Sequence, residues 1–489
     1  MPVDLLKSAR WQATDLGLPM PDEVHAVSAC LPTWDHNIGY EEADPTVISA
    51  LQAAYPRFCL HPLITELCGK SIDSNEFAGL PFASHKAAER ALNYVQFYGV
   101  REAKLAPLPK QSACGVAVPR TQFGLLKQYW QHAGENVSSR VAELILQGKS
   151  ANCGPTAARS AVKSKVAQLQ NAGDHDVFLF PSGMAAIACA YRTVQRHQSG
   201  STCQFGFPYV DTLKLQERLP NAKRSFFPIG SDNDLAELQR QCLSSPPVAV
   251  FCEVPTNPLL VIPDIRRLRE LADEFGFLLI IDDTLGACCN LNVLPFADLA
   301  VTSLTKFFSG YGNVLAGSLV VNPEGRHSEK LRNLISGDFE ELLADCDVEV
   351  LHRNSQDLHQ RMAAINSNAG QLVQFLRQHS AIDQVFYPDR QSDKYHAVAK
   401  PDGGGGGLLS IVLKKPEQTT PQVFDRLEVC KGPNLGTNFT LCCPYTILAH
   451  YTELDFAEQC GVSRWLLRIS VGTEPVAELI RRFERAFGS

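Results

Sequence analysis

The chain carries the apolar segment FLLII (Phe277–Ile281), which leads directly into the acidic turn DDT (Asp282–Thr284). A short apolar run of this kind is typical of a strand buried on both faces of a parallel sheet. Similar segments at Val248–Val254 and Gly317–Val321 are separated from it by other sequence, which includes the helical pattern of Ile265–Phe275. Alternating strands and helices predict an α/β fold whose mostly parallel sheet has helices on both faces.

The regular alternation of strands and helices does not extend over the whole chain, so we expect three parts. Residues 1–153 should form an N-terminal arm and an irregular extension, with few periodic segments up to about 75 and again at about 104–155. Residues 154–345 should form the large domain, and residues 346–489 a smaller α+β domain with a strand at Leu408–Leu413. The glycine run Gly403–Gly407 precedes that strand and is interpreted as a flexible loop.

Composition excludes several classes of function. The 489 residues carry a net charge of −7 and 20% charged residues, with no basic run of the kind that binds nucleic acid. No apolar stretch approaches the length of a membrane span, and the N-terminus lacks a secretory pattern, so we expect a cytoplasmic protein. None of the 16 cysteines are spaced as Cys-x-x-Cys. We therefore predict reduced thiols and no metal site.

Lys306 lies in the segment AVTSLTKFFSG (Ala300–Gly310), just past an apolar strand. A lysine held near neutrality there can form a Schiff base with a carbonyl cofactor. The hydroxyl groups of Ser303 and Thr305 suit a phosphate. Asp282, at a strand end upstream, suits a pyridinium nitrogen, and together these groups indicate pyridoxal 5′-phosphate (PLP). The alternative is a capped turn with a solvated lysine.

Four further residues support the cofactor interpretation. Gly183 and Met184 lie between a predicted strand and helix, where backbone N–H groups and the helix dipole can bind phosphate. This signal is weak by itself, because strand-to-helix turns often contain Ser and Gly. Tyr209 has a ring that can lie over a planar cofactor, although a core tyrosine is the alternative. Asn257, in the turn PTNP, follows a strand at the edge where ligands of α/β sheets bind, but a proline-bracketed turn explains it equally well.

Arg468 is a charged residue inside the apolar run LLRISVG (Leu466–Gly472). A buried arginine needs an anionic partner, and the carboxylate of a substrate would provide a bidentate one. A structural salt bridge is the alternative.

Taken in order along the chain, these motifs resemble the Cys/Met-metabolism family of PLP enzymes, most closely its fungal-type, cystathionine γ-synthase-like branch. The resemblance covers about residue 154 to the C-terminus. It rests on SGM at 182–184, PTNP at 255–258, Asp282, SLTK at 303–306 and RISVG at 468–472. It implies the PLP-dependent transferase fold of type I, with a seven-stranded sheet, and a homotetramer built as a dimer of dimers.

The resemblance also implies a role for each site residue. Lys306 would bind the cofactor as a Schiff base and then act as the acid and base, beside the catalytic partners Tyr209 and Asp282. Tyr209 would stack on the cofactor ring, and Asn257 would contact its phenolic oxygen. Arg468 would bind the substrate carboxylate. The phosphate would be held by Gly183, Met184, Ser303 and Thr305.

Two assignments are less direct. Members of the family take a phosphate-binding arginine from a neighbouring subunit, in a Tyr-x-Arg motif upstream of Asn-Pro-Thr. Arg140 is the preferred candidate here, because Tyr55-Pro56-Arg57 matches the short motif but lies much further upstream. Asn434 replaces a serine that lies near the lysine in relatives, and we expect it to contact substrate.

The implied reaction is a γ-replacement on an O-acyl-homoserine through a vinylglycine-type intermediate, with cysteine or another sulfur nucleophile as acceptor. The alternatives are a carbon nucleophile in secondary metabolism, a γ-lyase and a non-catalytic relative. Where relatives often read Ser-Leu-Gly-Gly-x-Glu, this chain reads NLGTNF (Asn434–Phe439). Phe439 cannot bind the ammonium group of cysteine, so the site is either retuned for another nucleophile or a fungal-type variant that still uses cysteine.

Overall fold

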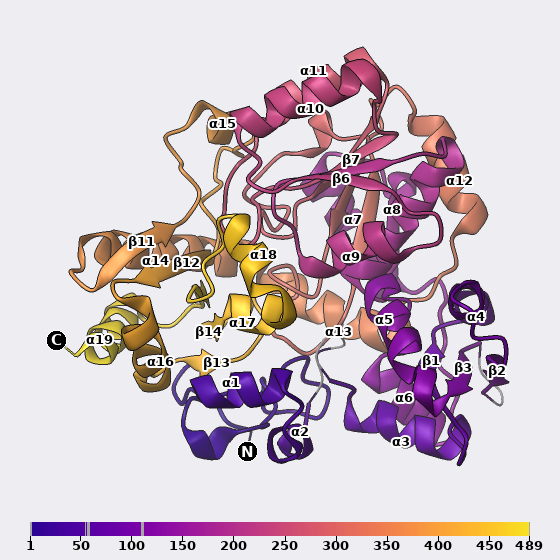
Figure 1. Ribbon diagram of the computed structural model, residues 1–489, viewed down its shortest axis with the longest axis horizontal. Coiled ribbons are helices and arrows are strands. Elements are labelled where there is room, and N and C mark those ends of the chain that lie inside the picture. Colours follow the sequence, from indigo (N-terminus) through magenta and orange to yellow (C-terminus); the bar gives the residue numbers. More distant parts are fainter. Residues whose placement is uncertain (1, 54, 56–58, 109–111, 489) are drawn as a thin grey trace.

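The central feature of the computed structural model is a seven-stranded sheet in the order β4-β10-β9-β8-β7-β5-β6 (Figure 1). The structure describes residues 2–53, 55, 59–108 and 112–488. The strands are β4 (Val177–Phe180), β5 (Thr202–Phe205), β6 (Arg224–Phe227), β7 (Ala249–Glu253), β8 (Leu278–Asp282), β9 (Leu299–Thr302) and β10 (Gly317–Val321). β10 runs opposite to the other six strands, which share one direction, and this confirms the predicted, mostly parallel sheet.

Helices cover both faces of this sheet, as its apolar strands require. One face packs against α8 (Gly183–His197), α9 (Val210–Arg218) and α12 (Ser328–Asp338). The opposite face packs against α7 (Ala157–Gln170), α10 (Asp232–Ser244), α11 (Ile265–Phe275) and α13 (Asp345–Asn354). The carboxyl ends of β7 and β8 therefore meet at one edge between the two helical layers.

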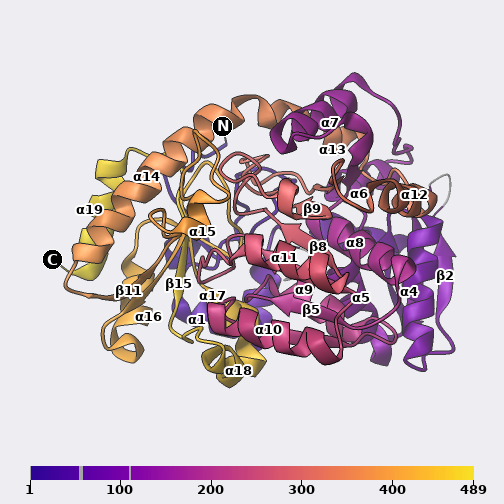
Figure 2. The ribbon, with the colours of Figure 1, turned by 90° about the horizontal axis from the view of Figure 1, so that it is seen from above.

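The C-terminal part forms a second sheet in the order β11-β12-β15-β14-β13. Its strands are β11 (Ile382–Phe386), β12 (Leu408–Leu413), β13 (Cys430–Lys431), β14 (Leu441–Pro444) and β15 (Leu467–Ser470). Its helices are α14 (Leu358–Gln378), α15 (Asp393–His396), α16 (Pro416–Arg426), α17 (Tyr445–His450), α18 (Leu454–Gln459) and α19 (Val476–Phe487). Figure 2 shows α14 and α19 at one end of the molecule, opposite α4 and β2.

The first 150 residues are more regular than the sequence predicted. The helices are α1 (Trp34–Glu41), α2 (Pro45–Ala50), α3 (Pro62–Ser71), α4 (His85–Phe97), α5 (Phe123–Ala133) and α6 (Ser139–Leu146). The strands β1 (Phe77–Phe82), β2 (Lys104–Pro107) and β3 (Cys114–Pro119) form a small antiparallel sheet. The expectation of irregular chain at about 104–155 was wrong, because these short elements share a hydrophobic core of their own.

The segment before α3 lies along the C-terminal sheet, far from it in sequence (Figure 1). The N–H of Leu31 donates to the carbonyl of Lys431 at 2.9 Å. The buried ammonium of Lys431 in turn donates to the carbonyl of Pro32 at 3.2 Å. These contacts hold the N-terminal arm beside the small domain. The three domain limits that the sequence suggested remain a prediction.

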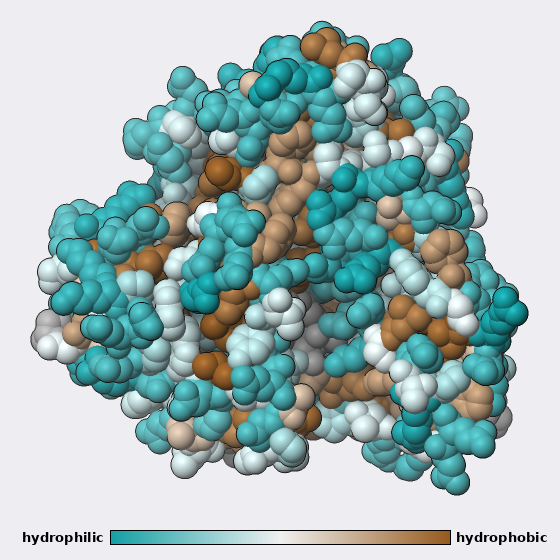
Figure 3. All heavy atoms as spheres, in the orientation of Figure 1, coloured by the Kyte–Doolittle hydropathy of each residue, from teal (hydrophilic) through white to brown (hydrophobic). Residues whose placement is uncertain are grey.

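The surface in Figure 3 is hydrophilic over most of the visible face, with hydrophobic residues in scattered groups. In the described part of the chain, no helix is long and apolar enough to cross a membrane. The cysteines form no disulfides there, and most of them are buried.

Candidate active site

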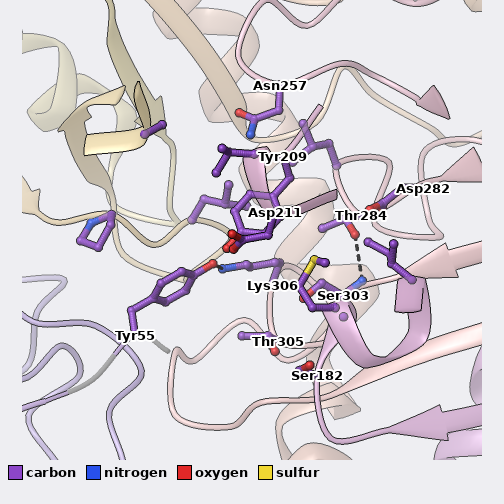
Figure 4. A pocket seen from close by; sticks show the side chains of 18 of the residues that line it. Tyr55, Ser182, Tyr209, Asp211, Asn257, Asp282, Thr284, Ser303, Thr305 and Lys306 are labelled. Carbon is purple, nitrogen blue, oxygen red and sulfur yellow. Dashed lines mark hydrogen bonds between the residues drawn. The ribbon is translucent and has the colours of Figure 1, made fainter. Parts of the chain in front are cut away.

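A pocket opens at the carboxyl ends of β7 and β8, between the central sheet and the C-terminal sheet (Figure 4). It holds about 1170 Å³ of space, counting its open mouth. The large domain contributes the start of α8, the strand ends and the loop that follows β9. The small domain contributes residues near β14, α17 and β15. Of the predicted residues, Gly183, Met184, Tyr209, Asn257, Asp282, Ser303, Thr305, Lys306 and Arg468 all line this pocket.

Lys306 lies at the centre of the pocket, on the turn after β9, and only 7% of it is exposed. Its Nζ donates to the hydroxyl of Tyr55 at 2.8 Å and to Oδ1 of Asn434 at 2.6 Å. Burial lowers the pKa of Lys306, and the charge of Arg468 adds to this effect while Tyr55 opposes it. A lysine with a lowered pKa supplies the neutral amine that Schiff-base formation requires.

Asp282 ends β8 on the far side of the pocket from Tyr55 (Figure 4). The N–H of Thr284 donates to its carboxylate at 2.9 Å. Burial raises the pKa of Asp282 to about 6, against the effect of the Thr284 hydrogen bonds. The group is therefore mainly ionised at neutral pH, as a partner of a pyridinium nitrogen must be.

The start of α8 presents backbone N–H groups at one end of the pocket. Ser182 caps the helix by accepting a hydrogen bond from the N–H of Ala185 at 3.0 Å. The N–H groups of Gly183 and Met184 belong to the first turn, which has no intrahelical acceptors. Gly183 packs so closely on Ser303 that a Cβ added to it would lie 2.7 Å from the Ser303 Cβ. The result is a cradle of backbone N–H groups beside a serine hydroxyl.

Thr305 lines the same end, but its hydroxyl has other partners. It donates to the carbonyl of Ala316 at 3.2 Å and accepts from the N–H of Ala316 at 2.9 Å. These bonds close the loop that carries Lys306. A contact between Thr305 and a phosphate stays a prediction.

Arg468 projects from β15 toward Asn257, across the interface between the two sheets. Its guanidinium donates to Oδ1 of Asn257 at 3.3 Å and to the carbonyl of Pro433 at 2.7 Å. It also lies 4.9 Å from the ring centre of Tyr445. The residue is 6% exposed and forms no ion pair with a described acidic residue. A buried arginine held only by neutral groups is well suited to a carboxylate ligand.

Asn434 lies next to the lysine, as the sequence predicted from its position. It is 2% exposed and accepts the Lys306 hydrogen bond through Oδ1. Its Nδ2 is buried and has no partner among the described residues. An unsatisfied buried donor at this place suits a substrate oxygen, so its predicted contact with substrate remains reasonable.

Arg140 lies outside the pocket of its own chain. It borders a smaller cavity, where it donates to the carbonyl of Asn313 at 2.8 Å and pairs with Asp347 at 3.2 Å. A contact with the phosphate of a neighbouring subunit stays a prediction. Arg57, the alternative that the sequence raised, is outside the described residues.

Phe439 does not line the lysine pocket of its own chain, so its suggested influence on the choice of nucleophile stays a prediction. The ring is 3% exposed and packs in a cluster with Leu5, Met20 and Leu441. A glutamate here would face the N-terminal arm rather than a substrate. In this chain, the residue at 439 therefore packs against the N-terminal arm.

We expect Phe439→Glu to lower the stability to unfolding by about 3–5 kcal/mol, because it buries an unpaired charge. Chemical denaturation of the variant and of Phe439→Leu would measure this, since leucine keeps the site apolar. An improved use of cysteine, with stability unchanged, would instead show that residue 439 reaches the acceptor.

Tyr55 and Glu253 are among the pocket residues that the sequence analysis did not assign. Tyr55 bonds to Lys306 from the N-terminal arm, although the short motif around it had been set aside for its distance along the chain. Glu253 ends β7 beside Asp282, and only its place at a strand end could have indicated it.

Comparison with known proteins identifies the family. A profile of the Cys/Met metabolism PLP-dependent enzymes matches residues 152–488. The chain belongs to this family. Cystathionine gamma-synthase of Neurospora crassa is 34% identical over 96% of this chain and 98% of its own length. The cystathionine gamma-synthase-like protein ankD of Aspergillus thermomutatus is 33% identical, with 96% and 94% covered.

The fold agrees with this assignment. Cystathionine gamma-lyase from Lactobacillus plantarum, solved in complex with L-serine, superposes with a TM-score of 0.59 at 25% identity, covering 68% of this chain and 87% of that one. The protein is thus a PLP-dependent, cystathionine γ-synthase-like enzyme, as its motifs predicted. Its pocket fits the cofactor: a buried amine, an ionised strand-end carboxylate and an anion cradle surround one cavity.

Proposed function

We propose that this enzyme catalyses a γ-replacement on an O-acyl-homoserine, with cysteine or another sulfur nucleophile as acceptor. The observation that carries the proposal is the position of Lys306 between two anion sites, the start of α8 and Arg468. The first suits the phosphate of PLP and the second suits an amino-acid carboxylate. With the cofactor held at the first site and the substrate carboxylate at the second, the Cα of the substrate would face the Lys306 amine.

Bound PLP supplies an electron sink that makes the Cα–H and Cβ–H bonds of an amino acid acidic. Lys306 Nζ would take the proton from Cα and return it after replacement at Cγ, because it is the buried amine in the middle of the pocket. Asp282 would keep the pyridine nitrogen protonated, and Tyr209 would cover the ring. Arg468 and Nδ2 of Asn434 would orient the substrate carboxylate. Asn257 would contact the phenolic oxygen.

Leu435, Leu448 and Ala449 of the small domain also line the pocket. This apolar lining suits an acceptor with an apolar body, so a carbon nucleophile is the second candidate. The relatives named cystathionine gamma-synthase favour cysteine as the acceptor. A γ-lyase would release 2-oxobutanoate and ammonia without any acceptor.

The decisive experiment offers O-acetyl-homoserine together with cysteine and a β-keto acid, and identifies the products by mass spectrometry. We expect cystathionine as the main product. A carbon-linked amino acid with cysteine left unused would establish the second candidate instead. Release of 2-oxobutanoate at the same rate without either acceptor would contradict both.

We also propose that the active assembly is a homotetramer, built as a dimer of dimers in which Arg140, which lies outside the pocket of its own chain, serves the pocket of a neighbouring subunit. Light scattering on the eluting holoenzyme would give its mass. A monomer with full activity would contradict this assembly and the proposed role of Arg140.

Tyr55→Phe tests the contact between the arm and the lysine. Loss of the hydroxyl removes the 2.8 Å hydrogen bond to Lys306 but keeps the ring. We expect kcat to fall by about 10²-fold with PLP still bound, because the position and proton affinity of the amine both change. Steady-state kinetics beside visible absorbance would check this, and unchanged kcat would exclude a role for Tyr55.

A further inference from the structure

Glu253 and Asp282 place two carboxyl groups at one edge of the central sheet. They are register partners on the parallel neighbours β7 and β8. Partners on adjacent strands lie about 4.8 Å apart, and their side chains point to the same face. Both side chains line the lysine pocket, and Glu253 is only 6% exposed.

Two carboxylates this close in a buried site cannot both be ionised without a cation between them. The backbone N–H of Thr284 binds Asp282, which faces the place of the pyridinium nitrogen. Glu253 accepts one hydrogen bond, from the N–H of Tyr209, at 2.5 Å. Its second oxygen forms no hydrogen bond with a described residue, and it lies in the wall of the pocket.

We propose that Glu253 is a neutral carboxylic acid in the resting protein and acts as a positioning residue. It holds the backbone of Tyr209, whose ring covers the cofactor, and it leaves Asp282 as the single ionised carboxyl at this edge. The role of Asp282 in this inference rests on the proposed function, whereas the proton on Glu253 does not.

The charged surroundings of Glu253 agree with this assignment. Burial and then the Asp282 carboxyl raise the pKa of Glu253 well above its usual value. The Tyr209 N–H from the segment after β5 and the Arg468 guanidinium from β15 oppose the rise. Burial raises the pKa of Asp282 only to about 6. Of the two groups, Glu253 therefore keeps the proton at neutral pH.

Infrared difference spectroscopy tests the proton directly in the apoprotein. The spectrum of the wild-type protein minus that of the Glu253→Gln variant should show the carbonyl stretching band of a protonated carboxylic acid. Asp211→Asn is the matched control, because Asp211 lines the same pocket but is bonded to His132 at 3.0 Å. This variant should keep the band. Absence of the band from wild-type protein would overturn the proposal, whether or not the enzyme makes cystathionine.

The holoenzyme gives a second readout, the cofactor absorbance, which separates a neutral Glu253 from an ionised one. Glutamine mimics the neutral acid, so Glu253→Gln should leave the midpoint of the pH titration of the cofactor absorbance unchanged. If Glu253 were ionised, its loss would remove a negative charge beside cationic groups and lower that midpoint by about one unit or more. Glu253→Leu should weaken PLP binding about tenfold, since it removes the carboxyl oxygen that accepts the Tyr209 N–H.

Discussion

Replacing Lys306 by alanine is expected to lower kcat by at least about 10³-fold and to prevent reductive trapping of PLP on the protein. The physical reason is that Lys306 is the buried amine at the centre of the pocket, with a lowered pKa and two side-chain acceptors. The variant should still bind PLP through the start of α8, because that cradle does not include the lysine side chain. Borohydride treatment followed by peptide mass spectrometry measures the trapping.

Lys394→Ala is a suitable control for Lys306→Ala. Lys394 pairs with Asp232 on the surface, away from the pocket, and its loss should change neither trapping nor kcat. Reductive trapping of the cofactor on a different lysine in Lys306→Ala would show that the site assignment is mistaken.

Arg468→Met should lower kcat/KM for the amino-acid donor by about 10²- to 10³-fold, mainly through KM. Methionine has a similar apolar stem but leaves the substrate carboxylate without its buried cation, a loss of about 2–5 kcal/mol. Arg468→Lys keeps the charge but loses the bidentate geometry. Its kcat/KM should therefore lie between the values of Arg468→Met and the wild type. Steady-state kinetics with O-acetyl-homoserine checks both.

Cofactor affinity separates this role of Arg468 from a structural one. PLP binding in Arg468→Met should stay near the wild-type value, because the residue lies on β15 and is not part of the backbone N–H cradle at the start of α8. Weak PLP binding together with unchanged KM would indicate that Arg468 supports the interface between the sheets instead.

Part of the central sheet could be predicted from sequence: the predicted apolar segments correspond to β7, β8 and β10, whereas β5 and β6 were not predicted. The helix at Ile265–Phe275 begins and ends where the helical pattern placed it. The fully buried strands read as apolar runs, because a strand between two helical layers has no polar face. Pocket residues such as Lys306 and Asp282 were predictable for the same reason: polar groups at the ends of such strands must meet at one edge.

The N-terminal arm and the glycine run were not predictable in this way. The run Gly403–Gly407 was expected to be a flexible loop, yet its members pack tightly between the domains. A Cβ added to Gly403 would lie 2.2 Å from the carbonyl oxygen of Asn290, and the N–H of Gly404 donates to the same residue at 2.9 Å. Glycine is therefore required because the backbone of Asn290 approaches the run too closely for a side chain. A low-complexity sequence does not reveal such a contact.

By itself the sequence determined the sheet, the family and the main polar residues, because burial of strands and the order of motifs are local properties. Only the tertiary structure decided which residues, distant in sequence, lie beside these polar residues. It brought Tyr55 from the arm to Lys306, placed Phe439 in the core of the arm, and set Glu253 beside Asp282. Such pairings depend on how surfaces remote in sequence pack together, and no local pattern encodes that contact.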